Sequence, residues 1–325
     1  MLQKMNIEDK VAIETNNDKK FSLKEEWNSW IKHLNWPFTI FHIISHIVAL
    51  YGFLTFPYLT HKLTAFWAYA YYIFAGFGVA AGAHRYWTHR SFKAKLPFQI
   101  ILAAGYYSTG MFQLRRWIKL HRIHHKYTDT DSDPHNINRG FWFAHIGWFL
   151  LPKHPEFLKK LKEIDMSDIN ADPVVNFGDK HFVILTILLT FILPTVVPVF
   201  LWNETWYLAI ISQCFMRYNF VINAISSVNS VAHMFGYKPY DRTIQPRDSK
   251  LAQLLTQGEG WHNFHHTFPW DYRGGEVSKI DFNFSLYLIK KFEQIGWVYD
   301  CKIANNELIR SVMDKRGDDS YKLYK

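Results

Sequence analysis

The chain contains four long runs that carry almost no charge. Three of them have no Asp, Glu, Lys or Arg at all, namely Trp36–Thr60 over 25 residues, Leu63–Ala83 over 21 and Phe182–Asn203 over 22. The fourth, Thr205–Ser227, is interrupted only by Arg217. A helix needs about 20 apolar residues to cross the hydrocarbon core of a bilayer. We therefore predict an integral membrane protein with four transmembrane helices, in preference to a soluble α protein with long buried helices.

The four runs form two pairs, and the connector within each pair is very short. His61 and Lys62 separate the first pair, and Glu204 separates the second. Each pair is expected to form a hairpin whose tip barely leaves the membrane. All Lys and Arg except Lys62 and Arg217 lie outside the spans and tips, so the positive-inside rule makes that side cytosolic. The net charge of +9 is then a one-sided basic face, which suits a membrane surface or a phosphate-bearing substrate rather than nucleic acid.

These boundaries divide the chain into five segments. They are a cytosolic N-terminal tail at 1–35, a transmembrane hairpin at 36–83, a cytosolic cap segment at 84–181, a second hairpin at 182–227, and a further cap segment with the C-terminal tail at 228–325. Leu96–Leu114 is also free of charge but contains Pro, Gly and Gln. We expect it and Gly140–Leu151 to lie in the membrane interface rather than to cross.

Nine of the 17 histidines lie in three clusters and one single position. They are His84 and His89, then His121, His124 and His125, then His233 alone, and finally His262, His265 and His266. On a helix, residues three or four apart share a face, whereas neighbours diverge by about 100°. Neighbouring histidines in His-x-x-His-His therefore suit two different ions, and the repeated motif predicts a two-metal site. The five-residue spacing of the first cluster suits a helix end that has begun to unwind.

The identity of the metal follows less directly. The clusters contain no Cys, and imidazole suits zinc, copper, iron and nickel. A structural zinc takes four ligands and a bis-histidine haem takes two, so neither accounts for nine histidines. A metal transporter would place its ligands within the spans. An all-nitrogen two-metal site beside a membrane favours iron that activates dioxygen.

Several motifs resemble those of the membrane acyl-CoA desaturases, the stearoyl-CoA desaturase family, and most of all its insect members. The motifs are Gly82–Arg85, His121–Asn136, Gly140–Pro155, Asn229–His233 and Gly258–Tyr272. The resemblance covers Trp36 to Asp300 and implies an all-α protein with a four-helix membrane stem and a cytosolic helical cap that holds a di-iron centre. It also implies that the nine clustered histidines are the iron ligands and that Asn229 binds one iron through a water.

The resemblance further implies an enzyme of the endoplasmic reticulum membrane with both termini in the cytosol. Such an enzyme uses O2 to remove two hydrogens from adjacent methylenes of a saturated fatty acyl-CoA, giving a cis double bond at Δ9 or another position such as Δ11. The electrons come from cytochrome b5, which cytochrome b5 reductase reduces with NADH. A fatty-acyl hydroxylase or acetylenase on the same scaffold is the alternative in chemistry. A non-catalytic acyl-binding paralogue is the alternative of another class, and the complete set of nine histidines with Asn229 weighs against it.

The positions expected to contact the substrate depart from the family pattern. Trp117 and Lys119 precede the second histidine cluster, and Lys119-Leu120 replaces the family's Arg-Asp. Pro152-Lys153 replaces an Arg-Lys pair, and Ser226 replaces a Trp near the thioester. In the second span, Tyr72 and Gly76 match positions that line the far end of the acyl tunnel. A glycine there is expected to leave more room for the chain.

The remaining histidines are expected to have structural roles. His42 and His46, four residues apart inside the first span, should hydrogen-bond between helices. His135 and His145 are expected to support the site or the fold without binding metal.

Overall fold

Four long helices dominate the structure, a computed structural model that describes residues 31–275 and 283–320. They run over Trp36–Thr55, Lys62–Thr88, Phe182–Trp202 and Trp206–Met234, and each is long and apolar enough to cross a membrane. Their outward-facing side chains, such as Ile47, Leu54 and Phe66, are exposed, as lipid contact requires. The predicted four-helix membrane fold is thus confirmed. Most of the predicted tail at 1–35 lies outside the described residues.

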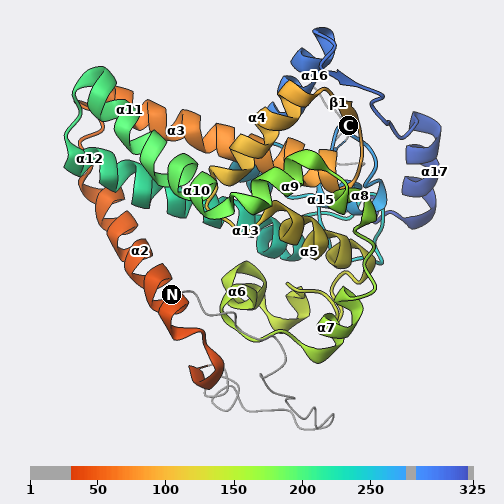
Figure 1. Cartoon of the computed structure of the whole chain (residues 1–325). Coiled ribbons are helices and arrows are strands. Elements are labelled where there is room, and N and C mark those ends of the chain that lie inside the picture. Colours follow the sequence, from red (N-terminus) through yellow and green to blue (C-terminus); the bar gives the residue numbers. More distant parts are fainter. Residues whose placement is uncertain (1–30, 276–282, 321–325) are drawn as a thin grey trace.

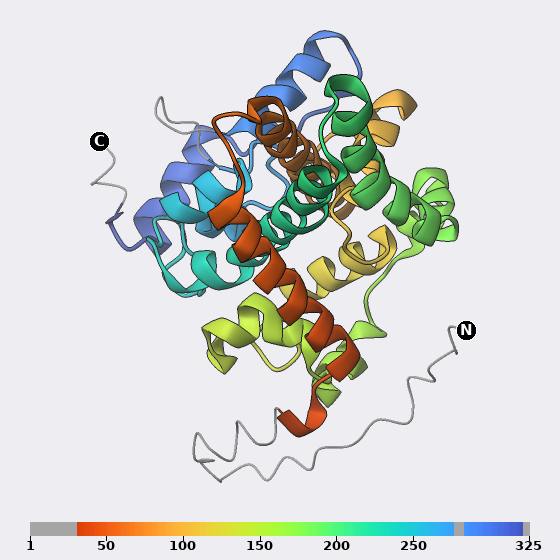
Figure 2. The same cartoon turned by 90° about the vertical axis from the view of Figure 1, so that its left-hand side faces the viewer.

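Three of the four long helices contain π-helical turns. Their parts are α2 (Trp36–Thr55) for the first; α3 (Lys62–Phe77) and η2 (Gly78–Thr88) for the second; α10 (Phe182–Thr186), η5 (Ile187–Ile192) and α11 (Leu193–Trp202) for the third; and α12 (Trp206–Ile210), η6 (Ile211–Arg217) and α13 (Tyr218–Met234) for the fourth. The second and fourth helices extend beyond the apolar runs and carry histidines in their last turns. The hairpin tips lie together at one end of the molecule in Figure 1, and Figure 2 views the bundle from that side.

Shorter elements build the cap at the other end of the helices (Figure 1). Between the hairpins they are β1 (Lys93–Ala94), α4 (Leu96–Tyr107), α5 (Leu114–Lys126), η3 (Ile137–Arg139), η4 (Phe143–Gly147), α6 (Trp148–Leu150), α7 (Pro155–Leu161), α8 (Ser167–Asn170) and α9 (Pro173–Lys180). After the fourth long helix they are α14 (Lys250–Thr256), α15 (His262–Thr267), α16 (Phe284–Gln294), β2 (Val298–Tyr299) and α17 (Asn306–Arg316). The antiparallel pair β1–β2 is a small departure from the predicted all-α fold.

The apolar stretch after the first histidine cluster packs against the second long helix. It forms α4, whose 12 residues span about 18 Å, too short to cross the hydrocarbon core. A side chain at either Gly78 or Gly105 would overlap the backbone of the other helix, so two glycines allow the close crossing. Phe98 and Leu102 are fully buried beside this crossing. Tight packing here fixes the end of the second helix, which bears His84.

The two hairpin tips are joined by a buried carboxylate. Glu204 accepts a hydrogen bond of 2.5 Å from the hydroxyl of Thr64, and its Oε2 lies 2.8 Å from Nδ1 of His61. The indole of Trp202 donates to the same Thr64 hydroxyl at 2.9 Å. Glu204 is only 6% exposed. The few polar residues of the tips therefore hold the hairpins to each other.

A second polar network joins the first and fourth long helices to the cap. The ring of His46 lies 3.0 Å from the amide nitrogen of Asn223, and the amide oxygen of Asn223 lies 3.1 Å from His145 Nε2. The other ring nitrogen of His145 lies 2.8 Å from the hydroxyl of Ser230. His46 and His145 thus have the structural roles expected of them. His42, in contrast, is buried with no hydrogen-bond partner for either ring nitrogen within the described part of the chain.

Candidate metal centre and substrate cavity

The nine clustered histidines converge into two groups inside the cap. The five-histidine group consists of His84, His89, His121, His125 and His265, and the four-histidine group consists of His124, His233, His262 and His266. Each histidine of a group contributes one ring nitrogen, and these nitrogens all lie within 4.8 Å of one another. Neighbouring Nε2 atoms approach to 2.8 Å between His84 and His265, and to 3.1 Å between His233 and His262. Each group therefore has the donor set of one metal ion.

The two His-x-x-His-His motifs contribute to both groups in a reciprocal way. In α5, His121 and His125 belong to the five-histidine group, and His124 belongs to the other. In α15, the first and last histidines, His262 and His266, belong to the four-histidine group, and His265 to the other. The first and last histidines of each motif, four residues apart, share a helix face, and the middle histidine points about 80° away from the centre of that face. Helical geometry therefore divides each motif between two centres.

The first histidine cluster lies on a widened helix rather than on an unwinding one. The amide of His89 donates to the carbonyl of His84 at 3.1 Å, the i to i+5 hydrogen bond of a π-turn. This winding brings residues five apart to one side, and the two rings lie 4.9 Å apart. π-Helical turns of this kind occur frequently at functional sites.

Three carboxylates lie behind histidine rings, on the Nδ1 side that faces away from the interior of each group. The sequence patterns did not identify them. Oxygens of Glu259, Asp133 and Asp129 lie near the Nδ1 atoms of His84 (2.6 Å), His124 (2.8 Å) and His233 (3.0 Å), respectively. A ring that donates from Nδ1 presents the lone pair of Nε2 to the interior. All three carboxylates lie in or beside recognisable motifs. Only the folded chain, however, pairs each with its histidine, since Glu259 and Asp129 are more than 100 residues from their partners.

The electrostatics of the two groups favour neutral rings. Burial, followed by the proximity of other imidazoles, lowers the pKa of most of the clustered histidines well below its ordinary value. These histidines are His89, His121, His125, His262, His265 and His266. For His124, burial also opposes the charged form, but the Asp133 carboxylate raises the pKa overall. A neutral ring whose proton is on Nδ1 presents the lone pair of Nε2, and the Nε2 atoms converge here, so the residues present suit a pair of metal ions.

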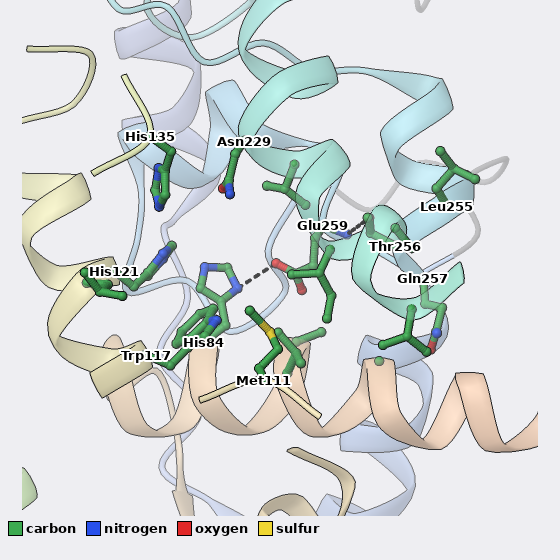
Figure 3. A pocket seen from close by; sticks show the side chains of 18 of the residues that line it. His84, Met111, Trp117, His121, His135, Asn229, Leu255, Thr256, Gln257 and Glu259 are labelled. Carbon is green, nitrogen blue, oxygen red and sulfur yellow. Dashed lines mark hydrogen bonds and ion pairs between the residues drawn. The ribbon is translucent and has the colours of Figure 1, made fainter. Parts of the chain in front are cut away.

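An apolar cavity leads away from the histidines between the second and fourth long helices (Figure 3). His84, His121 and His262 line one end together with Asn229, and Trp117 lies beside them. The Trp117 ring stacks on His121, with centroids 4.9 Å apart. Small and branched side chains of the two helices form the walls, including Val79, Ala80, Val221, Ala224 and Ile225.

The far end of the cavity is closed by contacts between α3 and α14. Tyr72 donates its hydroxyl proton to the carbonyl of Leu255, and Gln257 donates its side-chain amide to the carbonyl of Tyr72 at 3.5 Å. A Cβ at Gly76 would overlap the amide of Gln257. The expectation that Gly76 leaves open room is therefore corrected, because the Gln257 side chain fills that space. Gln257 is a lining residue that the sequence did not reveal.

A second cavity adjoins the first, since both are lined by Met111, Phe112 and Trp148. Arg116 and Lys153 contribute cations to it. Burial and the nearby Arg116 and Arg139 lower the pKa of Lys153 to about 7, and its ammonium donates to the carbonyl of Trp148.

Two of the residues expected to contact substrate lie elsewhere. Lys119 and Ser226 are not among the residues that line either of these two cavities. Tyr72, Gly76 and Trp117 line the first cavity, and Lys153 lines the second.

Comparison with known proteins agrees with this site. Residues 61–273 match the family model described as fatty acid desaturase. An acyl-CoA Delta-9 desaturase of Acheta domesticus is 42% identical, over 90% of this chain and 82% of its own length. An acyl-CoA Delta(11) desaturase of Choristoneura rosaceana is 45% identical, over 74% of this chain and 72% of its own. A stearoyl-CoA desaturase of Sus scrofa is 42% identical, over 88% and 79%. The chain therefore belongs to the fatty acid desaturase family.

Proposed function

We propose that this protein is an acyl-CoA desaturase that introduces a double bond, cis in geometry, into a saturated fatty acyl-CoA. The reaction takes two hydrogens from adjacent methylenes, uses one O2 and two electrons with two protons, and yields two waters. The observation that carries the proposal is the apolar cavity that ends at the two convergent histidine groups. The curated relatives named above as Delta-9 and Delta(11) desaturases support both the reaction and the carrier.

Two iron ions are the proposed cofactors, held by the five-histidine and four-histidine groups. When bound, iron would supply the dioxygen chemistry that breaks an unactivated C–H bond. Asn229, which lines the cavity beside His262, is proposed to hold a water next to the four-histidine group. Glu259, Asp133 and Asp129 orient three of the rings, so that their Nε2 lone pairs point inward.

The protein's own residues would select the carbon that reacts. The apolar cavity walls would admit a hydrocarbon chain and exclude water. Trp117, which stacks on His121, would confine that chain near the histidines. The closed end at Tyr72 and Gln257 limits how far the chain can advance. The distance from that end to the histidines would then decide both chain length and double-bond position.

The coenzyme A portion is proposed to occupy the second cavity and the adjacent basic surface. Arg116 and Lys153 offer cations for its phosphates, and Lys119 lies on the same helix as Arg116. Cytochrome b5, reduced by its NADH-dependent reductase, is the proposed electron donor. The proposed location is the endoplasmic reticulum membrane, with the cap segments 84–181 and 228–325 and both termini in the cytosol.

The alternatives are less favoured. A hydroxylase or acetylenase would use the same oxidant, but the relatives reported above are named desaturases. A non-catalytic acyl-binding protein would have no need for nine converging ring nitrogens.

Expression in a desaturase-deficient cell, with analysis of double-bond location, tests the proposal. We expect new monounsaturated acyl chains from the wild type and none from His262→Ala. Hydroxylated chains would favour the alternative chemistry, and no product from a well-expressed protein would contradict the proposal.

A glycosylation sequon inserted within 126–139 should stay unmodified, and its modification would contradict the proposed orientation.

A further inference from the structure

The three carboxylates behind the histidines are unevenly divided between the two groups. Of the carboxylates in the described part of the chain, Glu259 alone pairs with a member of the five-histidine group, through His84. Asp133 and Asp129 both contact members of the four-histidine group, through His124 and His233. Half of the rings in the smaller group therefore have a carboxylate behind them, compared with one ring in five in the larger group.

The carboxylate behind the five-histidine group is neutralised by a cation. Arg85 donates to Glu259 Oε1 from Nη2 at 2.6 Å and from Nε at 3.0 Å, and its side chain is 2% exposed. Glu259 and Arg85 thus form a compact pair with no net charge. Arg122 also lies on the side of His89, although Asp168 pairs with it at 2.8 Å. The outer environment of this group carries little net charge.

The carboxylates behind the four-histidine group have no directly paired cation of this kind in the described residues, although Lys238 lies near enough to Asp129 to sense its charge. Asp133 is held by backbone amides, including that of Asp129 at 2.8 Å, and by the ring of His135 at 3.2 Å. Asp129 accepts from the amide of Ile137 at 3.3 Å. Within residues 31–275 and 283–320, neither carboxylate forms an ion pair with Lys or Arg. Two buried negative charges therefore face the four rings from behind.

We infer that the two metal positions are unequal, and that the four-histidine group binds its divalent cation more tightly than the five-histidine group. This inference rests on the proposed function only in taking both groups to bind metal. A carboxylate bonded to Nδ1 makes the imidazole a stronger donor, and loss of such a partner typically weakens metal binding 10–100-fold. Two carboxylates that form no ion pair with Lys or Arg in the described residues outweigh the single additional imidazole of the larger group. Asp133 and Asp129 are positioning residues in this scheme, since they act through the rings.

Adjacent residues on α15 provide a matched test. His265→Ala removes a ligand from the five-histidine group alone, and His266→Ala removes one from the four-histidine group alone. Each purified variant, loaded anaerobically with Fe²⁺, should hold one ion in its intact group and bind the other more weakly than the wild type does, because that group has lost one ligand. In competition with the chelator ferrozine, we expect His265→Ala to hold its tighter ion at least about tenfold more tightly than His266→Ala holds its own. Equal retention, or the reverse order, would overturn the inference.

The carboxylate variants test the cause in the wild-type ligand set. Asp133→Asn should release one of the two equivalents about 10–100-fold faster and leave the other unchanged. Asp129→Asn should act on the same equivalent, and Glu259→Gln on the other. A structural collapse would instead speed the release of both, which also counts against the inference. If the wild type does not bind two equivalents of Fe²⁺, the two-iron proposal itself is refuted. Desaturation assays on the same preparation show whether the protein is an active desaturase, independently of which group binds its ion more tightly.

Discussion

The side chain of Gln257 fills the space that Gly76 leaves on the second long helix, so a residue of the cap completes the wall of a cavity within the membrane stem. The amide of Gln257 also donates to the carbonyl of Tyr72. Under the proposed function, the accepted length of the acyl chain is expected to depend jointly on α3 and on Gln257, the residue that caps the C-terminal end of α14.

Substitutions at this pair should change the acyl chains that the protein accepts. Gln257→Ala removes the amide and should shift the products toward longer chains. Gly76→Leu places a larger side chain in the same space and should shift them toward shorter chains. The acyl profile of cells that express each variant provides the measurement, with the wild type as control. Identical profiles for all three proteins would show that this end of the cavity does not limit the chain.

The link between the hairpin tips should contribute to stability in a pH-dependent way. Glu204→Gln weakens charge-assisted hydrogen bonds in a buried position and should cost about 1–3 kcal/mol of unfolding free energy. Although burial opposes ionisation, hydrogen bonds from Thr64 and His61 lower the pKa of Glu204 overall. Because the folded pKa is depressed, this contribution is present above the ordinary value of 4.5 and is lost as pH falls through the lowered value.

Thermal unfolding in detergent at neutral and acidic pH measures this contribution. The difference between the wild type and Glu204→Gln should shrink in acid. A variant as stable as the wild type at neutral pH would show that the tips are held together by packing alone.

Substrate affinity should depend on pH through Lys153. Since the pKa of its ammonium is lowered to about 7, most of the charge is present below pH 7 and is lost as pH rises above it. A phosphate bound beside Lys153 needs that charge, so the KM for acyl-CoA should rise about tenfold between pH 6 and 8.5. Lys153→Arg should give a flat profile with retained affinity, and Lys153→Met a flat profile with weak affinity. A KM that rises equally in all three proteins would assign the dependence to another group.

Removal of metal should destabilise the cap. Ligands that bind only the folded state stabilise it by RT ln(1 + [L]/Kd), or about 4 kcal/mol at 1,000 times the Kd. Chelation should lower the unfolding temperature of the wild type, and Fe²⁺ should restore it. The double variant His265→Ala/His266→Ala provides the control, because its response to the chelator should be much smaller. An unfolding temperature insensitive to chelation would mean that the histidine groups hold no metal in the isolated protein.

The parts of the structure that the sequence predicted are those encoded by neighbouring residues. An absence of charge over 20 residues defines a membrane span wherever it occurs, and the spacing of His121, His124 and His125 defines their directions on a helix. The outer partners depend on distant segments. Nothing near Glu259 in the sequence indicates that it would contact His84, because α15 and η2 meet only in the folded cap. The same limit concealed Gln257, since its place against Gly76 depends on how α14 packs.

The second and fourth long helices are continuous from the hairpin tips to the histidine groups, so the thickness of the bilayer can affect the positions of the histidines. His84 and His233 lie on helices that begin at the hairpin tips, whereas His125 and His265 lie on helices confined to the cap. Helices that span a membrane tilt to match its thickness, at a modest cost for each ångström of mismatch. A tilt of either helix changes the distance between a membrane-borne ligand and its cap-borne partners. A change in lipid composition that alters bilayer thickness, as the product of such an enzyme could cause, would thus be expected to alter the geometry of the two histidine groups.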